Sequence, residues 1–457
     1  MRTRPATTTS VWTGITRLQW WTFAIVSSAW FFDTLDQRLF SVARIPAVSA
    51  LMRLPPVDPG VQAFAKVATA LFLLGWGVGG LSLGALGDRF GRVRVLTGSI
   101  AVYSIGSGLT ALCDSPAQFA ALRLLSGVGI GGVFGLAVAI ITDTVEGSAR
   151  IVMLAAFQLL SNVGNLMAAA ANVLVNLLAA HDVVSPTNRW RWLFAVGALP
   201  VLLATWSHFT LEEPVSWLRL KSAGALPRHI FGPYVELFRD SRARRHLFAG
   251  TLLSVSGVAG IWAVGEYAVD LQQAVFTTFF MHVAPAEAVT DRVEQTKSAA
   301  FALQMLGGAC GMAVFTWAAV RFGCRPAFII GFSAAFVVTT VVYWRLQTPR
   351  DAFWMMPLMG AAQLSVFAGL AMYLPELFRT EVRATGVSFA YNVGRFAAAG
   401  GSLGSAYLAT HVFAGSAAPA PLRYSAMMMC TVFLIGVLAA VRAPETRGGG
   451  EPPRASS

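Results

Sequence analysis

The sequence is poor in charge and in the residue clusters that covalent chemistry needs. Only 12% of its 457 residues are charged, about half the share found in a soluble domain. The four cysteines and six histidines are scattered, with no CxxC or HxxxH spacing among them. No nucleophile–base pair is visible either. The sequence therefore predicts neither a soluble domain nor an enzyme, and no disulfide framework, metal site or cofactor is expected.

Long apolar segments dominate the chain, and 56% of its residues are hydrophobic. Segments of about 20 residues, long enough to cross a bilayer, recur along its whole length. Backbone groups inside lipid must be satisfied within the segment, so each should be a helix. We predict twelve such helices, at residues 19–42, 62–86, 93–113, 117–144, 150–179, 190–209, 247–275, 296–320, 325–345, 352–378, 384–412 and 422–441.

The formal net charge of +12 is explained by membrane topology. With both termini in the cytoplasm, the loops on that side carry about twice as many Lys and Arg residues as the opposite loops. No basic domain stands outside the spans, so no nucleic-acid partner is expected. No small-residue cleavage site follows the first apolar run, which is therefore predicted to be a membrane helix. We expect a multi-pass protein of the plasma membrane, specifically a bacterial inner membrane.

A polar interval at residues 210–246 divides the spans into two sets of six. The predicted organisation is an N-terminal bundle at 1–209, a cytoplasmic linker at 210–246, a C-terminal bundle at 247–441 and a cytoplasmic tail at 442–457. Arg-Phe-Gly at residues 89–91 recurs at 321–323, and Glu213 recurs as Glu445 at the same displacement. Duplicated halves of this kind place a binding site between them near the bilayer midplane.

The loop GALGDRFGRVR at residues 84–94 resembles the loop between the second and third helices of the major facilitator superfamily. Four more strings resemble segments of its sugar porters and metabolite:proton symporters, including the aromatic-acid and sialate symporters. They are RLLSGVGIGG (123–132), LEEPVSWL (211–218), PELFRTEVRATG (375–386) and APETRG (443–448). The resemblance implies an all-α integral membrane protein with twelve transmembrane helices in two pseudo-symmetric six-helix bundles, the major facilitator fold.

The same resemblance implies a gating role for this loop. In the family, its acid and arginines pair with charges at neighbouring helix ends and close the inner side. A plain positive-inside anchor would explain the arginines but neither Asp88 nor the glycines. The residues expected to form the gate are Gly84, Asp88, Arg89, Gly91, Arg92, Asp143, Arg150, Glu381 and Arg383.

Two acids within the first span are candidates for proton coupling. Asp33 and Asp36 are three residues apart, hence on one helix face. Two carboxylates in low dielectric repel, so one of them should bind a proton more readily. The string WFFDTLDQRLF resembles the paired-aspartate DGxD motif of aromatic-acid:proton symporters, with Thr34 in place of the glycine. The alternative is a structural cluster neutralised by Arg38 or Arg44.

Arg395 is the main candidate for binding an anion. It lies near the middle of the eleventh span, and its planar fork of donors matches a carboxylate. Asn392 lies one turn earlier on the same face. The alternative is a permanent salt bridge to a buried acid such as Glu266, which is itself another candidate for proton coupling.

Further polar residues complete the predicted substrate site. Arg123 occupies a position that faces inward in the family, where it could bind an anion; alternatively it snorkels to the surface. Gln158 and Asn162 place amides along the fifth span, where sugar porters use a glutamine to bind hydroxyls. Hydrogen bonds between helices are the alternative for these amides.

These features together predict a secondary active transporter. It would import a small organic acid or related metabolite by proton symport through alternating access. The expected partners are the small-molecule substrate, protons and the lipid bilayer, and the protein is expected to be a monomer without cofactors. The alternatives are a facilitator for a neutral sugar or polyol, and a non-transporting membrane sensor with the same fold.

Overall fold

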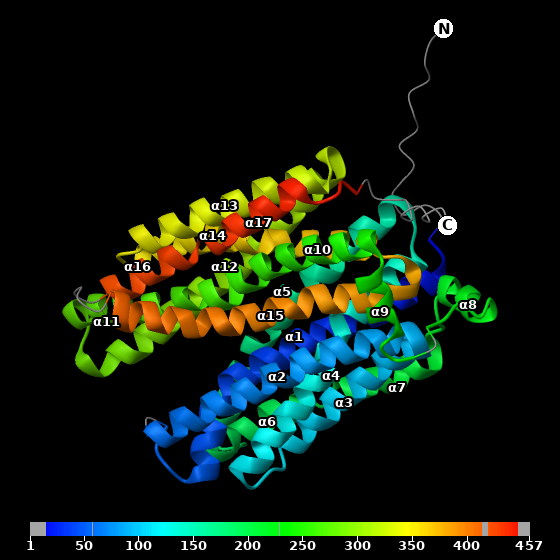
Figure 1. The fold of residues 1–457 in the computed structure, drawn as a ribbon. Helices are drawn as coiled ribbons and strands as arrows, with labels where there is room; N and C mark the ends of the chain where they lie inside the picture. The colour runs from blue at the N-terminus through cyan, green and yellow to red at the C-terminus, as the bar shows by residue number, and fades with distance from the viewer. Residues whose placement is uncertain (1–14, 57, 228, 414–418, 447–457) are drawn as a thin grey trace.

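The protein is a bundle of long, roughly aligned helices (Figure 1). The computed structural model describes residues 15–56, 58–227, 229–413 and 419–446. All regular structure within these ranges is helical. Most of the tail predicted at 442–457 lies outside the described residues.

The N-terminal half begins with five long helices and ends with a broken sixth. Helix starts follow local capping chemistry: Thr16 caps the first helix in a capping box with Gln19, and Ser115 caps the fourth just before Pro116. The elements are α1 (Arg17–Met52), α2 (Pro59–Phe90), α3 (Arg92–Thr110), α4 (Pro116–Thr144), α5 (Gly147–Ala180), η1 (Pro186–Asn188), α6 (Arg189–Val196) and α7 (Pro200–Thr210).

Two short helices, α8 (Val215–Ser222) and α9 (Gly232–Arg239), follow at one end of the bundle. We call this the linker end, and the end where α6 and α11 lie the far end (Figure 1). The C-terminal half contains α10 (Ser241–Ala259), the π-helical turn η2 (Gly260–Val264), α11 (Glu266–Val283), α12 (Ala286–Phe322), α13 (Cys324–Arg345), α14 (Pro349–Tyr373), η3 (Leu374–Leu377), η4 (Thr380–Val382), α15 (Arg383–Tyr407), η5 (Leu408–Val412), α16 (Ala420–Met429) and α17 (Val432–Arg442).

These elements form twelve transmembrane helices, each at a position predicted from hydropathy. Among the described residues, nine helical stretches are long and apolar enough to cross a membrane on composition alone. Helices α1, α3 and α15 complete the set, with polar residues in their middles. Helix α1 continues about ten residues beyond its predicted end at residue 42. It does so because Ala43, Ala47 and Val48 still pack inside the bundle after the apolar run has ended.

Glycines set the closest helix contacts in both halves. A Cβ at Gly79 of α2 would collide with the Val128 backbone of α4, so the two helix backbones are in contact here. Small residues four apart on a helix permit such close contact. Gly311 of α12 meets the backbone of Ala361 of α14 in the same way. The displacement from Gly79 to Gly311 equals that from Glu213 to Glu445. The two halves therefore repeat one packing scheme.

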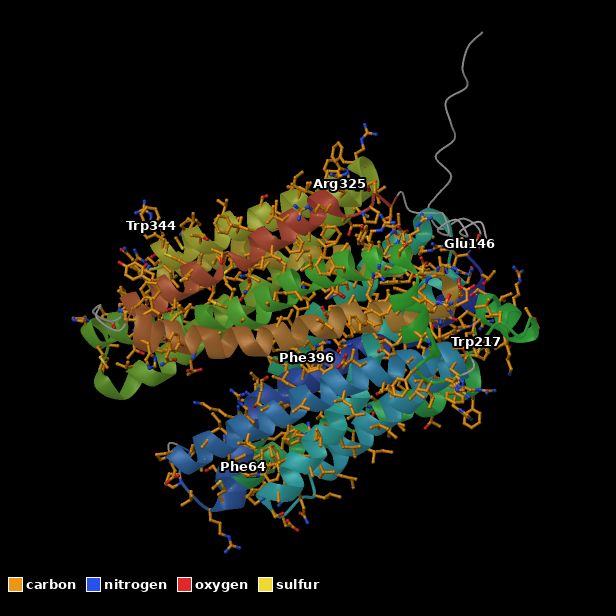
Figure 2. The ribbon with its side chains drawn as sticks, viewed as in Figure 1. Phe64, Glu146, Trp217, Arg325, Trp344 and Phe396 are labelled. Carbon is orange, nitrogen blue, oxygen red and sulfur yellow. The ribbon has the colours of Figure 1, made fainter. Side chains whose placement is uncertain are left out.

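The halves meet mainly through α2 and α4 against α15, and through α5 against α12 and α14. In Figure 1 the two groups of helices lie close together near α8 and α9, and diverge toward α6 and α11. Trp217 marks the linker end and Trp344 the far end in Figure 2. Phe396 lies along the seam between the halves, where it fills the space beside Gly77 of α2.

Candidate functional site

Asp88, in the last turn of α2, binds the first turn of α15 across the seam. The amides of Ala384 and Thr385 donate to its carboxylate at 3.2 and 2.8 Å, and the Thr385 hydroxyl donates at 2.7 Å. The first amides of a helix are unsatisfied and favour an anion. Here the anion comes from the other half of the molecule, so the contact exists only while the halves are together at the linker end.

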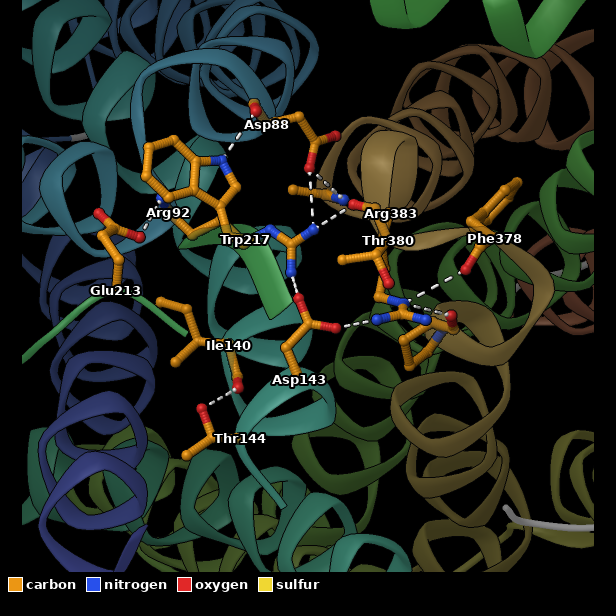
Figure 3. A network of polar contacts seen from close by, with 12 residues as sticks. Asp88, Arg92, Ile140, Asp143, Thr144, Glu213, Trp217, Phe378, Thr380 and Arg383 are labelled. Atoms are coloured by element: carbon orange, nitrogen blue, oxygen red, sulfur yellow. Dashed lines mark hydrogen bonds and ion pairs between the residues drawn. The ribbon is translucent and has the colours of Figure 1, made fainter. Parts of the chain in front are cut away.

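Asp143, at the end of α4, joins two arginines from opposite halves (Figure 3). It forms ion pairs with Arg92 of α3 and Arg383 of α15. Arg92 also donates to Asp88 at 3.3 Å and to the carbonyl of Thr380. Arg92 and Asp143 are almost fully buried, and each has a second partner of opposite charge, Asp88 for Arg92 and Arg383 for Asp143.

Glu213 fixes the loop that carries these groups. It accepts hydrogen bonds from the amides of Arg92, Val93 and Arg94 at 2.8 to 3.1 Å, and so caps the start of α3. Gly91 has a φ of 117°, and a Cβ at this position would collide with the Glu213 carboxylate. This geometry explains why glycine is needed at the turn.

The C-terminal half repeats this cap without the acid of the loop. Glu445 accepts from the amides of Cys324 and Arg325 at 2.8 and 3.3 Å, beside Gly323 with a φ of 99°. Val320 occupies the place of Asp88. Only the N-terminal copy of the loop can therefore bind the other half through a carboxylate.

Six of the nine predicted gate residues lie together in this cluster: Gly84, Asp88, Gly91, Arg92, Asp143 and Arg383. Gly84 lies against Ala384 and Ser388 of α15. The other three have different partners. Arg89 lies over the ring of Phe90, Arg150 donates to the carbonyl of Val145, and Glu381 accepts from Arg379.

Helix α9 also spans the seam at the linker end. The Tyr234 hydroxyl donates to the carbonyl of Leu81 on α2 at 2.6 Å. Glu236 pairs with Arg379 at 3.6 Å, just before η4 of the other half. Burial raises the pKa of Glu236, and the nearby Arg379 opposes that rise. Sequence reasoning treated this segment only as a linker.

Arg395 lies at the seam in the middle of the molecule, between rings from both halves. Its guanidinium lies 3.4 Å from the centre of the Trp76 ring on α2 and 4.7 Å from that of Tyr391 on α15. It donates to Asn392 at 2.8 Å, while its buried Nε has no hydrogen-bond partner. The side chain of Glu266 lies outside the described residues, so its predicted pairing with Arg395 stays a prediction.

Asp33 of α1 is fully buried near Arg395. Gln37 donates to one carboxylate oxygen at 2.7 Å, and the second oxygen has no hydrogen-bond partner. Asp33 interacts electrostatically with Arg395, although no ion pair within 4.0 Å joins them. Buried polar atoms are rarely left unpaired. Acid and guanidinium thus offer opposite charges with unused hydrogen-bonding capacity in one region.

Further aromatic rings and amides lie at the seam. Phe134 of α4 stacks on Tyr391 of α15, with ring centres 3.8 Å apart. On the side of α5, Gln158 is buried with its carbonyl oxygen unpartnered. Asn162 donates to the carbonyl of Met305 on α12 at 3.4 Å, which is the interhelical bond that we considered as the alternative. We call the group Asp33, Trp76, Tyr391, Asn392 and Arg395 the central cluster.

Asp36 points away from Asp33 and into the N-terminal half. Its carboxylate accepts from the Ser107 hydroxyl and lies 3.7 Å from Arg123, with neither charged side chain exposed. Arg123 also donates to the Thr110 and Ser126 hydroxyls at 2.7 and 3.0 Å. Snorkelling of Arg123 is therefore wrong, because the side chain turns inward to an acid.

The structural alternative for these aspartates named the wrong arginines. Arg44 donates to Thr69 at 2.8 Å, and Arg38 lies over the ring of Phe301 on α12. Neither forms an ion pair with Asp33 or Asp36. The partner of Asp36 comes from α4, about ninety residues along the chain, which local spacing could not reveal.

No group of three or more His, Cys, Asp or Glu side chains among the described residues could hold a metal ion. The described side chains could bind an anion beside buried carboxylates, at the seam between two similar halves. In proteins built from two repeated halves, such a seam is where a small solute binds.

Comparison with known proteins agrees with this geometry. The family model described as Major Facilitator Superfamily matches residues 13–405. A probable 4-methylmuconolactone transporter of Cupriavidus pinatubonensis is 28% identical over 437 residues, covering 93% of this chain and 91% of that protein. A cis,cis-muconate transport protein of Acinetobacter baylyi is 26% identical, with 82% and 87% covered.

Among solved structures, the proton:xylose symporter XylE bound to 6-bromo-6-deoxy-D-glucose matches in fold. Its TM-score is 0.71 at 18% identity, with 95% of this chain and 97% of that chain covered. The family match spans most of the sequence, and the helices, repeated halves and central seam fit it. The chain therefore belongs to the major facilitator superfamily of membrane transporters.

Proposed function

We propose that this protein is a secondary active transporter that imports a small organic acid together with protons. The observation that carries the proposal is Arg395, which is held between Trp76 and Tyr391 at the seam with its Nε unpartnered. Each half contributes one ring, so a solute bound here would touch both moving parts of an alternating-access carrier.

The central cluster matches a carboxylate on a flat, unsaturated body. An arginine binds a carboxylate through parallel donors, and aromatic rings bury planar carbon skeletons. Relatives named for muconate and 4-methylmuconolactone transport support this substrate class. Gln158 and Asn392 supply amide groups for the remaining polar atoms of the substrate.

Two carboxylates are available for proton coupling, in different surroundings. Asp33 faces the central cluster, where its charge would repel an anionic substrate until it is protonated. Asp36 is held by Arg123 and Ser107 inside the N-terminal half. Protonation of Asp36 would release Arg123, so this pair can couple proton binding to helix packing. Glu266 remains a third candidate.

Alternating access would use the cluster around Asp88 and Asp143 as the inner gate. In this structure that cluster joins the halves at the linker end, and the helices diverge at the far end. We place the linker end and both termini in the cytoplasm, because the basic linker follows the positive-inside rule. The far end then faces the outside, from which substrate and proton enter.

The test is uptake of radiolabelled cis,cis-muconate into proteoliposomes under an imposed pH gradient, inside alkaline. Accumulation should need the gradient, and Asp33→Asn or Asp36→Asn should abolish it while counterflow continues. Arg395→Gln should abolish both. Uptake that ignores the gradient, with both aspartate variants fully active, would refute proton symport.

A neutral sugar or polyol facilitator is the second candidate, favoured by the unpartnered carbonyl of Gln158. This candidate predicts uptake of a labelled sugar or polyol that Gln158→Ala stops and Arg395→Gln does not. A non-transporting sensor predicts substrate binding without counterflow. The same proteoliposomes therefore separate all three functions.

A further inference from the structure

The short helix α9 exposes an apolar stripe at the linker end of the membrane bundle. Phe231, Val235 and Phe238 recur at intervals of four and three residues, and their exposed fractions are 71%, 62% and 47%. Such spacing places them on one helix face. On the opposite face Pro233 and Leu237 are buried against the bundle. Helix α9 thus has two apolar faces, one packed on the bundle and one turned outward.

A basic cluster follows the stripe directly. Within seven residues, Arg239 ends α9 and Arg242, Arg244 and Arg245 lie in the first turns of α10, and all four are exposed. Among the nearby acids, Asp240 caps the amide of Arg242 at 2.9 Å, and Glu236 pairs with Arg379. The arginines therefore outnumber the acids that could neutralise them at this surface.

The position of the stripe limits what can cover it. Helix α10 belongs to the seventh transmembrane span, so α9 lies where that span leaves the bilayer. Tyr234 and Phe238 pack against Phe389 of α15, at 6.1 and 5.8 Å between ring centres. The stripe thus continues the outer surface of α15 beside the seam with α2.

We propose that α9 lies in the membrane interface and that the cluster of Arg239, Arg244 and Arg245 binds the phosphate of an anionic phospholipid. The stripe would bury into the acyl chains while the arginines meet the headgroup, the usual arrangement of an interfacial amphipathic helix. Charge complementarity selects an anionic lipid over a zwitterionic one. Because α9 contacts both halves, the bound lipid would favour the conformation closed at the linker end.

Native mass spectrometry of the purified full-length protein measures this binding with phosphatidylglycerol and phosphatidylcholine as probes. The wild-type chain should retain phosphatidylglycerol in preference to phosphatidylcholine. The variant R239Q/R244Q/R245Q should bind it roughly a hundred-fold more weakly, at about fivefold per arginine. The matched control R219Q/K221Q/R321Q removes three exposed charges elsewhere at the linker end and should bind as the wild type does.

A second pair of variants tests the apolar contact. F231Q/V235Q should weaken phosphatidylglycerol binding but leave binding of soluble glycerol phosphate unchanged. Equal lipid binding by wild type and the arginine variant overturns the proposal, as does an equal loss in the control. Light scattering that shows a dimer, dissolved by Val235→Glu, would assign the stripe to a second copy and also overturn it. Equal retention of phosphatidylglycerol and phosphatidylcholine by the wild type would also overturn the proposal.

Discussion

Thr385 of α15 binds Asp88 of α2 twice, through its amide at 2.8 Å and its hydroxyl at 2.7 Å. These bonds join the two halves at the linker end, together with the amide of Ala384. Hydrogen bonds to a charged group contribute about 1.5–3 kcal/mol each. In the alternating-access cycle that we propose, this contact would favour the conformation closed at the linker end.

Asp88→Asn should weaken closure at the linker end. Asparagine replaces one of the two accepting oxygens with an NH₂ donor and removes the charge, so we expect a shift of about 2 kcal/mol, roughly 30-fold in population. Arg94 and Arg325 lie exposed at the starts of α3 and α13 and can carry spin labels. Double electron–electron resonance should show longer distances between these labels in Asp88→Asn than in the wild type. Asp114→Asn changes an exposed acid at the far end and should leave them unchanged. Identical distributions for the wild type and Asp88→Asn would contradict a gating role.

Arg395→Lys should lose substrate binding although the charge is retained. Lysine lacks the planar fork and cannot stack between Trp76 and Tyr391 in the same way. We expect the affinity for muconate to fall by about 1–3 kcal/mol, or five- to 150-fold. The thermal shift that muconate produces measures this loss. Arg345→Lys is the matched control, because Arg345 also lies over a tryptophan, Trp344, but on the surface at the far end. An equal thermal shift in Arg395→Lys and wild type would remove Arg395 from the binding site.

The central cluster shows how far the sequence alone could lead. Arg395 and Asn392 were predictable because they are polar residues within one apolar span. Tyr391 lies one turn from Arg395 on the same helix face, but it was not predicted. Trp76 was not predictable, since it reaches Arg395 only through the packing of α2 on α15. Spans and motifs depend on local pattern, whereas contacts between halves depend on the arrangement of whole helices.

Asp33 and Asp36 show a second limit. Residues three apart on a helix point in directions that differ by about 60°, which is close enough to count as one helix face. In a bundle this angle is enough to send Asp33 toward the seam and Asp36 toward α3 and α4. The sequence alone does not show which of the two aspartates faces the seam and which faces the interior of the N-terminal half.

The Asp36–Arg123 pair should behave as one unit in stability measurements. Asp36→Asn or Arg123→Gln alone leaves a buried charge unpaired, and each should cost about 3–5 kcal/mol. The double variant removes both charges, so it should be less destabilised than the sum of the single changes. Thermal unfolding in one detergent gives the three values. Additive effects would mean that the two groups do not interact in the protein.

Glycines that pack helices within a half should differ in effect from those at the seam. A Cβ at Gly131 of α4 would collide with the backbone of α2, within the N-terminal half. A Cβ at Gly84 of α2 would instead meet Ser388 and Ala384 of α15, across the seam. The first contact lies within one half, so the proposed cycle would keep it. The second joins the halves, so the proposed cycle would break it.

Gly131→Ala should therefore lower the thermal stability, by about 1–3 kcal/mol as overpacking does. Gly84→Ala should leave stability nearly unchanged but lengthen the Arg94–Arg325 distance, because opening the linker end relieves the clash. Gly98→Ala is the control, since a Cβ there meets nothing within 4 Å, and alanine is the better helix former. If Gly84→Ala destabilised the protein as much as Gly131→Ala without changing the distance, α2 and α15 would not separate during the cycle. Closure at the linker end would then be a fixed feature of the fold rather than one state of a carrier.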